Sequence, residues 1–155
     1  LVLSSYQLPI WVWPAALVLA CALALLRGRD AERLAAATVL LAWSLTMVAF
    51  KNRSEDTQWL VLLIDTAQLP VFLWLALRSP RYWPLFAAAF KLLLVVTHLA
   101  HALDPRIGGW AYLTGALLWS YLALSAIAYG AWTAPRRYAE IEADELRDAA
   151  GATLR

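Results

Sequence analysis

The fold of this chain is decided by the stretch KLLLVVTHLAH, residues 91–101, which is apolar enough to lie in a lipid bilayer yet carries three ionisable side chains. On an α-helix, positions seven apart differ by about 20° of rotation and positions three apart by about 60°. Lys91, His98 and His101 therefore share one helix face. An ionisable residue at membrane depth costs roughly 2.5–3.5 kcal/mol on insertion scales, so it normally faces a protein interior, a partner or a cavity. The spacing predicts a polar seam along a membrane-embedded helix.

The composition of the whole chain favours a membrane protein. Of its 155 residues, 63% are apolar and 15% are charged, whereas soluble domains have about 25% charged residues. Successive helices that are apolar all round leave no polar face for water. The nine Trp and six Tyr suit the interfacial belts of a bilayer. We expect membrane lipids around the chain and no nucleic-acid partner, because the net charge of +2 is small and scattered.

Charged and turn-forming residues divide the chain into five apolar segments. They predict transmembrane helices at about residues 8–26, 34–50, 58–77, 85–103 and 110–132. The second is close to the lower limit of ~17 residues for a span. We therefore predict that residues 1–134 form an all-α polytopic membrane bundle. The charged residues 135–155 are expected to form a short cytoplasmic helix with a frayed end. Candidate partner contacts on this last helix are Arg136, Arg137, Tyr138 and Ile141.

The distribution of basic residues indicates the orientation of five spans. With the N-terminus outside, the outer side carries Lys51, Arg53 and Arg106. The inner side then carries Arg27, Arg29, Arg33, Arg78, Arg81, Arg136, Arg137, Arg147 and Arg155. Cytoplasmic loops carry the excess of Lys and Arg. We therefore expect a bacterial inner-membrane protein with its N-terminus outside and its C-terminus in the cytoplasm.

Asp65, with Gln68 three residues later on the same face, is expected to meet the seam. A short turn joins the third and fourth segments, so their helices are antiparallel neighbours. At ~1.5 Å of rise per residue, Asp65 falls between Lys91 and His98 in height. An Asp65–Lys91 ion pair would fix how the two helices meet. Alternatively, Asp65, Lys91 and His98 form a proton or ion relay, or a site contacted by another subunit.

The two histidines admit three interpretations. In the first, which is favoured for His101 near the outer boundary, they hydrogen-bond to neighbouring helices or to interfacial water. His98 is otherwise a candidate axial ligand for haem or a chlorin pigment. A haem clamped by two histidines needs them on different helices, and this chain has only these two, three residues apart. The third interpretation is zinc held with Asp65 or Asp104, but structural zinc normally has four N or S ligands, so no metal is assigned.

No catalytic motif points to an enzyme. The chain has no G-x-S-x-G, no H-E-x-x-H, no phosphate-binding loop and no Gly-rich dinucleotide fingerprint. The leading hypothesis is a small accessory subunit that packs against a larger membrane assembly, with its buried Asp, Lys and His residues fixing helix register or partner contact. The alternative is a haem- or chlorin-binding or proton-handling membrane protein centred on His98, Asp65 and Lys91.

Overall fold

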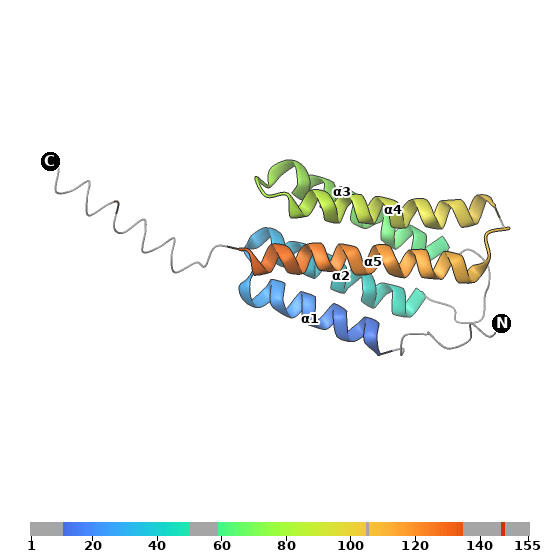
Figure 1. The fold of residues 1–155 in the computed structure, drawn as a ribbon, viewed down its shortest axis with the longest axis horizontal. Helices are drawn as coiled ribbons and strands as arrows, with labels where there is room; N and C mark the ends of the chain where they lie inside the picture. The colour runs from blue at the N-terminus through green and yellow to red at the C-terminus, as the bar shows by residue number, and fades with distance from the viewer. Residues whose placement is uncertain (1–10, 50–58, 105, 135–146, 148–155) are drawn as a thin grey trace, which may run out of the picture.

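The computed structural model describes residues 11–49, 59–104, 106–134 and 147. Within them the chain forms five α-helices (Figure 1): α1 Val12–Arg27, α2 Asp30–Ala49, α3 Trp59–Arg78, α4 Trp83–Leu103 and α5 Gly109–Trp132. These residues contain no strand, so the predicted all-α fold is confirmed. The helix predicted within residues 135–155 lies outside the described residues, except for Arg147. The same holds for its candidate partner contacts, Arg136, Arg137, Tyr138 and Ile141.

Four of the helices, α2 to α5, are long and apolar enough to cross a membrane, which is consistent with a multi-pass membrane protein. The described part of the first segment, α1, is shorter, with 16 residues. The second helix is longer than predicted, because it begins at Asp30 instead of residue 34 and has 20 residues. The Glu32 carboxylate accepts a hydrogen bond of 2.9 Å from the backbone N–H of Arg29, and this contact caps the first turn.

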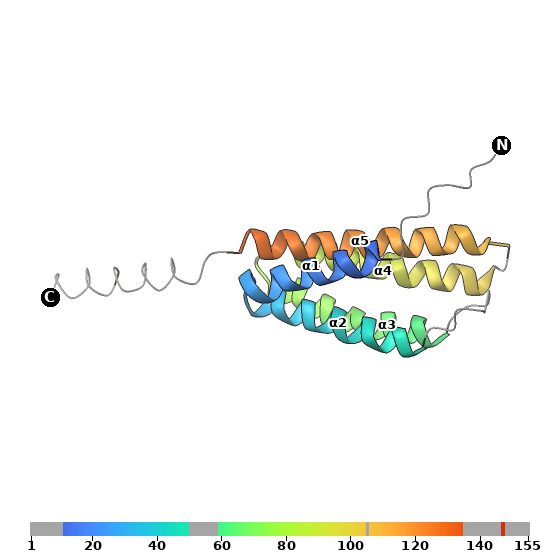
Figure 2. The ribbon, with the colours of Figure 1, turned by 90° about the horizontal axis from the view of Figure 1, so that it is seen from below.

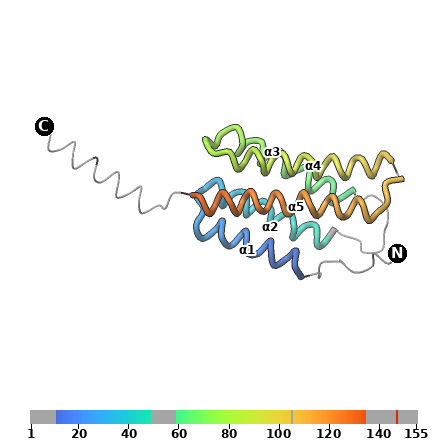
Figure 3. The backbone as a smooth tube through the Cα atoms, in the orientation of Figure 1, coloured from blue at the N-terminus to red at the C-terminus, as the bar shows by residue number. Residues whose placement is uncertain are grey.

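The helices form a ring in which each packs beside the next and α5 closes against α1, with a smaller contact between α5 and α2 (Figures 1 and 2). The smooth tube of Figure 3 shows that successive helices run in opposite directions. One end of the bundle holds the α1–α2 turn, the α3–α4 turn and the C-terminal end of α5; we call it the Arg81 end. The opposite end, with the α4–α5 turn, is the His101 end.

The apolar core is concentrated toward the Arg81 end. It consists mainly of alanine and other small residues with a few large ones: Leu17, Ala20, Cys21, Ala24, Ala35, Ala36, Val39, Phe72, Leu75, Trp83, Ala87, Ala88, Leu124, Ile127 and Ala131. Small residues allow helix backbones to approach closely. Among the glycines of α5, Gly130 has the closest neighbour, because a Cβ built there would lie 2.7 Å from the Trp83 ring. This half of the bundle is therefore densely packed.

The outer surface of the bundle is apolar. Large aliphatic side chains on four helices are more than two-thirds exposed, among them Leu19, Leu26, Val48, Leu77 and Leu103. A water-soluble protein rarely exposes contiguous apolar patches of this extent. Lipid chains can cover such a surface without cost, in agreement with the spanning length of the helices.

Candidate functional site

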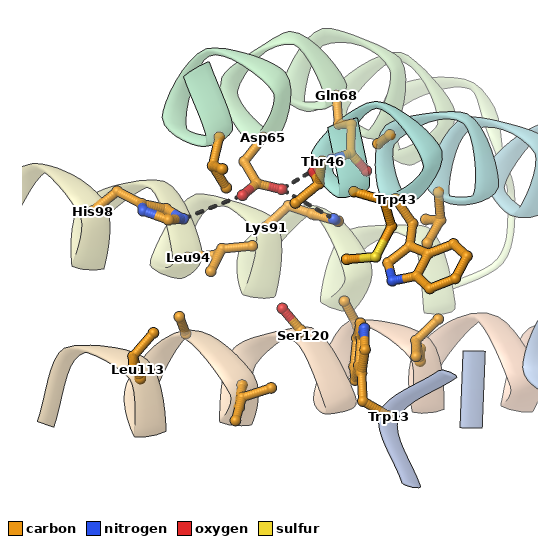
Figure 4. A pocket seen from close by; sticks show the side chains of 18 of the residues that line it. Trp13, Trp43, Thr46, Asp65, Gln68, Lys91, Leu94, His98, Leu113 and Ser120 are labelled. Carbon is orange, nitrogen blue, oxygen red and sulfur yellow. Dashed lines mark hydrogen bonds and ion pairs between the residues drawn. The ribbon is translucent and has the colours of Figure 1, made fainter. Parts of the chain in front are cut away.

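Asp65 is the centre of the polar seam predicted from the sequence. Its Oδ2 lies 3.2 Å from Nε2 of His98, and its Oδ1 lies 3.8 Å from Nζ of Lys91. Gln68 donates from Nε2 to the same Oδ1 at 3.0 Å. Figure 4 shows the four side chains converging between α3 and α4. Lys91 is 6% exposed and His98 is 3% exposed, so both groups find their partners within the chain.

Tyr112 extends the seam to α5. Its hydroxyl lies 2.7 Å from Nδ1 of His98, and its side chain is buried. Sequence reasoning did not include Tyr112 in the seam, because the rotation of α5 about its axis is not set by the pattern of α4. A signal was present nonetheless, since a buried Tyr hydroxyl usually needs a hydrogen-bond partner. The result is a continuous chain of contacts from Tyr112 through His98 to Asp65.

His101 lies at the end of the same face but in a different environment from the one expected. It is 8% exposed, and its Nδ1 donates to the backbone carbonyl of Ile107 at 3.1 Å. Its ring stacks on Tyr112, with centroids 4.3 Å apart and planes 12° from parallel. The turn between α4 and α5 thus supplies a partner for His101, for which the sequence left neighbouring helices and interfacial water open. His101 therefore contacts the seam at Tyr112.

A cavity of about 350 Å³ lies beside the seam, and every helix contributes to its wall. Its apolar lining includes Val39, Val61, Leu94, Leu113, Leu117 and Leu124, and its polar lining includes Thr46, Asp65, Gln68, Lys91, His98, Tyr112 and Ser120. The indoles of Trp13 and Trp43 also line it (Figure 4). The cavity extends from the dense core, with which it shares Val39 and Leu124, toward the His101 end.

Two residues that line the cavity each carry a buried polar atom without a hydrogen-bond partner. They are Oε1 of Gln68 and Nε1 of Trp43, and Nε1 of Trp83 in the core is a third such atom among the described residues. An unsatisfied buried donor or acceptor costs about 1–3 kcal/mol. The orientation of the Gln68 amide follows from its network, since the amine must face the Asp65 carboxylate and the oxygen must face away. Both atoms are buried against neighbouring side chains and do not open onto the cavity.

The arrangement suits proton exchange better than ring or metal ligation. Both imidazole nitrogens of His98 already have partners, Asp65 and Tyr112, so axial ligation of haem or a chlorin would have to break one of these contacts. For zinc, His101 is directed to Ile107, and the described residues contain no group of three His, Cys, Asp or Glu side chains that could hold a metal ion. A carboxylate, an imidazole and a phenol in series can instead accept and share a proton.

A second charged cluster, not predicted from the sequence, lies at the Arg81 end. Glu32 is 1% exposed, and its Oε1 pairs with Nη1 of Arg81. Arg81 also donates from Nη2 to the Gly130 carbonyl at 2.7 Å and to the Thr133 hydroxyl at 2.6 Å. The contact joins residues 49 apart, Glu32 in the first turn of helix α2 and Arg81 in the α3–α4 turn. Both lie in charged stretches of the sequence that resemble solvated loops. No local pattern in the sequence marks them as partners.

Comparison of the chain with family models, with curated proteins and with solved structures found no match. The fold and the site consequently define a class: an all-α bundle, consistent with a multi-pass membrane protein, that holds a buried carboxylate, amine, imidazole and phenol beside a cavity. Any narrower assignment depends on the chemistry of these residues.

Proposed function

We propose that this chain is a multi-pass membrane protein that takes up and releases a proton at His98. The observation that carries the proposal is the unbroken contact from the Tyr112 hydroxyl to His98 Nδ1 at 2.7 Å and from His98 Nε2 to Asp65 at 3.2 Å. Ionisable residues within membrane-spanning segments are costly and commonly mark proton pathways.

The contacts around His98 accommodate either protonation state. In the neutral ring, the Tyr112 hydroxyl donates to Nδ1 and Nε2–H donates to Asp65. When Nδ1 gains a proton, it donates to the Tyr112 oxygen, because a phenol both donates and accepts. Neither hydrogen bond is lost, so adding the proton requires only rotation of the hydroxyl. Lys91 pairs with Asp65 throughout, so the seam is formally neutral before uptake and carries one positive charge after it.

Exchange from one side of the bundle fits this geometry better than passage across it. The seam borders the cavity toward the His101 end. Toward the Arg81 end, the path is filled by buried side chains such as Phe72, Ala87 and Ile127, and the Glu32–Arg81 pair lies beyond them. The proposed role is therefore reversible proton binding that could be coupled to a ligand or partner, without proton transport through the chain.

The two histidines of the chain make a matched test. The full chain, labelled with ¹⁵N-histidine and reconstituted in lipid bilayers, is followed by NMR from pH 4 to pH 9. We expect His98 to change protonation state, with loss of the corresponding proton uptake in His98→Asn and its retention in His101→Asn. A His98 ring that stays in one state throughout, or uptake unaffected by His98→Asn, contradicts the proposal.

We also propose the orientation with the N-terminus outside and the C-terminus cytoplasmic, in a bacterial inner membrane. It is supported by Arg27, Arg29, Arg33, Arg78 and Arg81 at the Arg81 end, against Arg106 at the other. In a Cys21→Ser background, Gly108→Cys should be labelled from outside, because a side chain there meets nothing within 4 Å. Pro80→Cys in the α3–α4 turn should be labelled only after permeabilisation. The reverse pattern contradicts the orientation.

The accessory-subunit hypothesis stays a prediction. Pairing within α3, α4 and α5 favours the part of it in which buried charges fix helix register. The contact to a partner was assigned to Arg136, Arg137, Tyr138 and Ile141. Deletion of residues 135–155 should weaken co-purification of other membrane chains while the bundle stays inserted. Unchanged co-purification would remove the proposed role of this segment.

A further inference from the structure

We infer that the pocket between the start of α2 and the α3–α4 turn binds the phosphate headgroup of an anionic phospholipid. The pocket has a volume of about 400 Å³, within the ~300–1,000 Å³ typical of ligand sites. It lies at the Arg81 end of the bundle, where the α1–α2 and α3–α4 turns come together (Figure 3). This pocket is distinct from the cavity beside Asp65, and the inference does not depend on proton uptake at His98.

The charged side chains around this pocket carry a net positive charge. Three arginines line it, Arg29, Arg78 and Arg81, against two acids, Asp30 and Glu32. The buried Glu32 and Arg81 neutralise each other as an ion pair, so the excess positive charge belongs to the three exposed groups. Basic pockets between membrane-spanning helices are suited to anionic lipid headgroups.

Arg78 supplies the charge that the chain itself leaves uncompensated. Its side chain is exposed, and its guanidinium lies over the Trp74 ring, 5.5 Å from the centroid. Within the described part of the chain, no carboxylate forms an ion pair with it. A guanidinium presents its N–H donors in a planar fork that matches the oxygens of a phosphate. Arg78 is therefore the residue expected to hold the headgroup.

The apolar side of the pocket favours a lipid over a soluble phosphate. Leu34 and Trp74 line the pocket and are 41% and 48% exposed, and Leu77, next to Arg78 in the chain, is 86% exposed. Tryptophan is enriched at the level of the headgroups, where one side of the ring meets acyl chains. A phospholipid bound here places its phosphate at the arginines and its chains over these side chains, whereas a soluble phosphate leaves them uncovered.

The test compares phosphatidylglycerol with phosphatidylcholine of the same acyl chains. The full chain is purified in a neutral detergent, and the lipid that it retains is measured by native mass spectrometry at matched lipid concentrations. We expect phosphatidylglycerol to bind about fivefold more tightly, the factor that one basic group contributes near an anionic lipid. Soluble sn-glycerol 3-phosphate at the same concentration should not displace it.

Variants of the full chain locate the binding. Arg78→Gln should remove most of the preference for phosphatidylglycerol, and Arg78→Lys should keep most of it. Arg27→Gln is the matched control at the same end, because Arg27 also lies over a tryptophan, 5.2 Å from the centroid of Trp132, but does not line the pocket. It should leave the preference unchanged. Asp30→Asn removes an acid from the lining and should increase the preference, which gives a second measure if Arg78→Gln fails to fold.

Three results would overturn the inference. Equal binding of the two lipids to the unmodified chain would show that the pocket does not select an anionic headgroup. Equal losses in Arg27→Gln and Arg78→Gln would show a diffuse attraction to the whole Arg81 end. Displacement of the lipid by sn-glycerol 3-phosphate would show that a soluble phosphate ester occupies the pocket as well as a lipid does.

Discussion

The two buried charged clusters use the same kinds of residue in opposite ways. At the Arg81 end, Glu32 and Arg81 are fully engaged, with Arg29, Gly130 and Thr133 as their further partners, and dense packing adjoins them. Around Asp65, the contacts are longer, two atoms on the adjoining wall lack a partner, and a cavity is present. The first cluster joins helix ends through short contacts, whereas the second combines longer contacts with a neighbouring cavity and can change its protonation.

The largest effect should come from breaking the first cluster. Arg81→Leu leaves the Glu32 carboxylate buried without its counter-ion, which typically costs about 3–5 kcal/mol. The free energy of unfolding in detergent measures the loss. Arg81→Lys keeps the charge but loses the planar fork that reaches Gly130 and Thr133, so it should recover only part of the stability. Full recovery would show that charge alone matters at this end.

Removing one member of the Asp65–Lys91 pair should lower the free energy of unfolding by less than Arg81→Leu does. We expect about 3 kcal/mol, the lower limit for a buried pair. The 3.8 Å separation and the neighbouring cavity weaken it. Asp65→Leu should lower the free energy of unfolding more than Lys91→Leu, because the Asp65 carboxylate also accepts hydrogen bonds from Gln68 and His98. The double replacement should cost less than the sum of the two. Additive losses in this double-mutant cycle would mean that the two groups are not coupled.

Replacing two glycines of α5 by alanine tests how tightly the two halves of the bundle are packed. Gly130→Ala places a Cβ 2.7 Å from the Trp83 ring, and overpacking of this kind costs about 1–3 kcal/mol. Gly115→Ala meets only Thr97 Cγ2, at 3.5 Å. It should be neutral or stabilise by up to about 1 kcal/mol, since Ala favours helix. Thermal unfolding of both variants checks the difference, and equal effects would indicate that the core near Gly130 yields readily.

The smallest effect is expected at Tyr112. Tyr112→Phe removes one hydrogen bond to His98 Nδ1, with a net cost of about 0.5–1.5 kcal/mol. The ring still stacks on His101, so the helix contact is retained. Tyr129→Phe on the same helix, whose side chain is 65% exposed, serves as the control in the same unfolding measurement. A loss no greater than in this control would show that the Tyr112 hydroxyl does not support the seam.

Much of the architecture could be predicted from local sequence properties. The apolar segments predicted α2 to α5 to within about four residues at their ends, because length and hydropathy govern membrane-spanning helices. The spacing of Lys91, His98 and His101 predicted their shared face, because 3.6 residues per turn fix which side chains of one helix align. The position of Asp65 on the neighbouring antiparallel helix predicted its height between Lys91 and His98.

Tertiary structure alone decided how the helices are rotated and spaced against one another. Tyr112 meets His98 because α5 turns that face toward α4, and Glu32 meets Arg81 because the start of α2 and the α3–α4 turn converge at one end. The cavity, to which all five helices contribute, is likewise a product of how they pack together. Periodicity determines faces within one helix. The register, rotation and separation of two helices depend on the volumes of all the side chains between them.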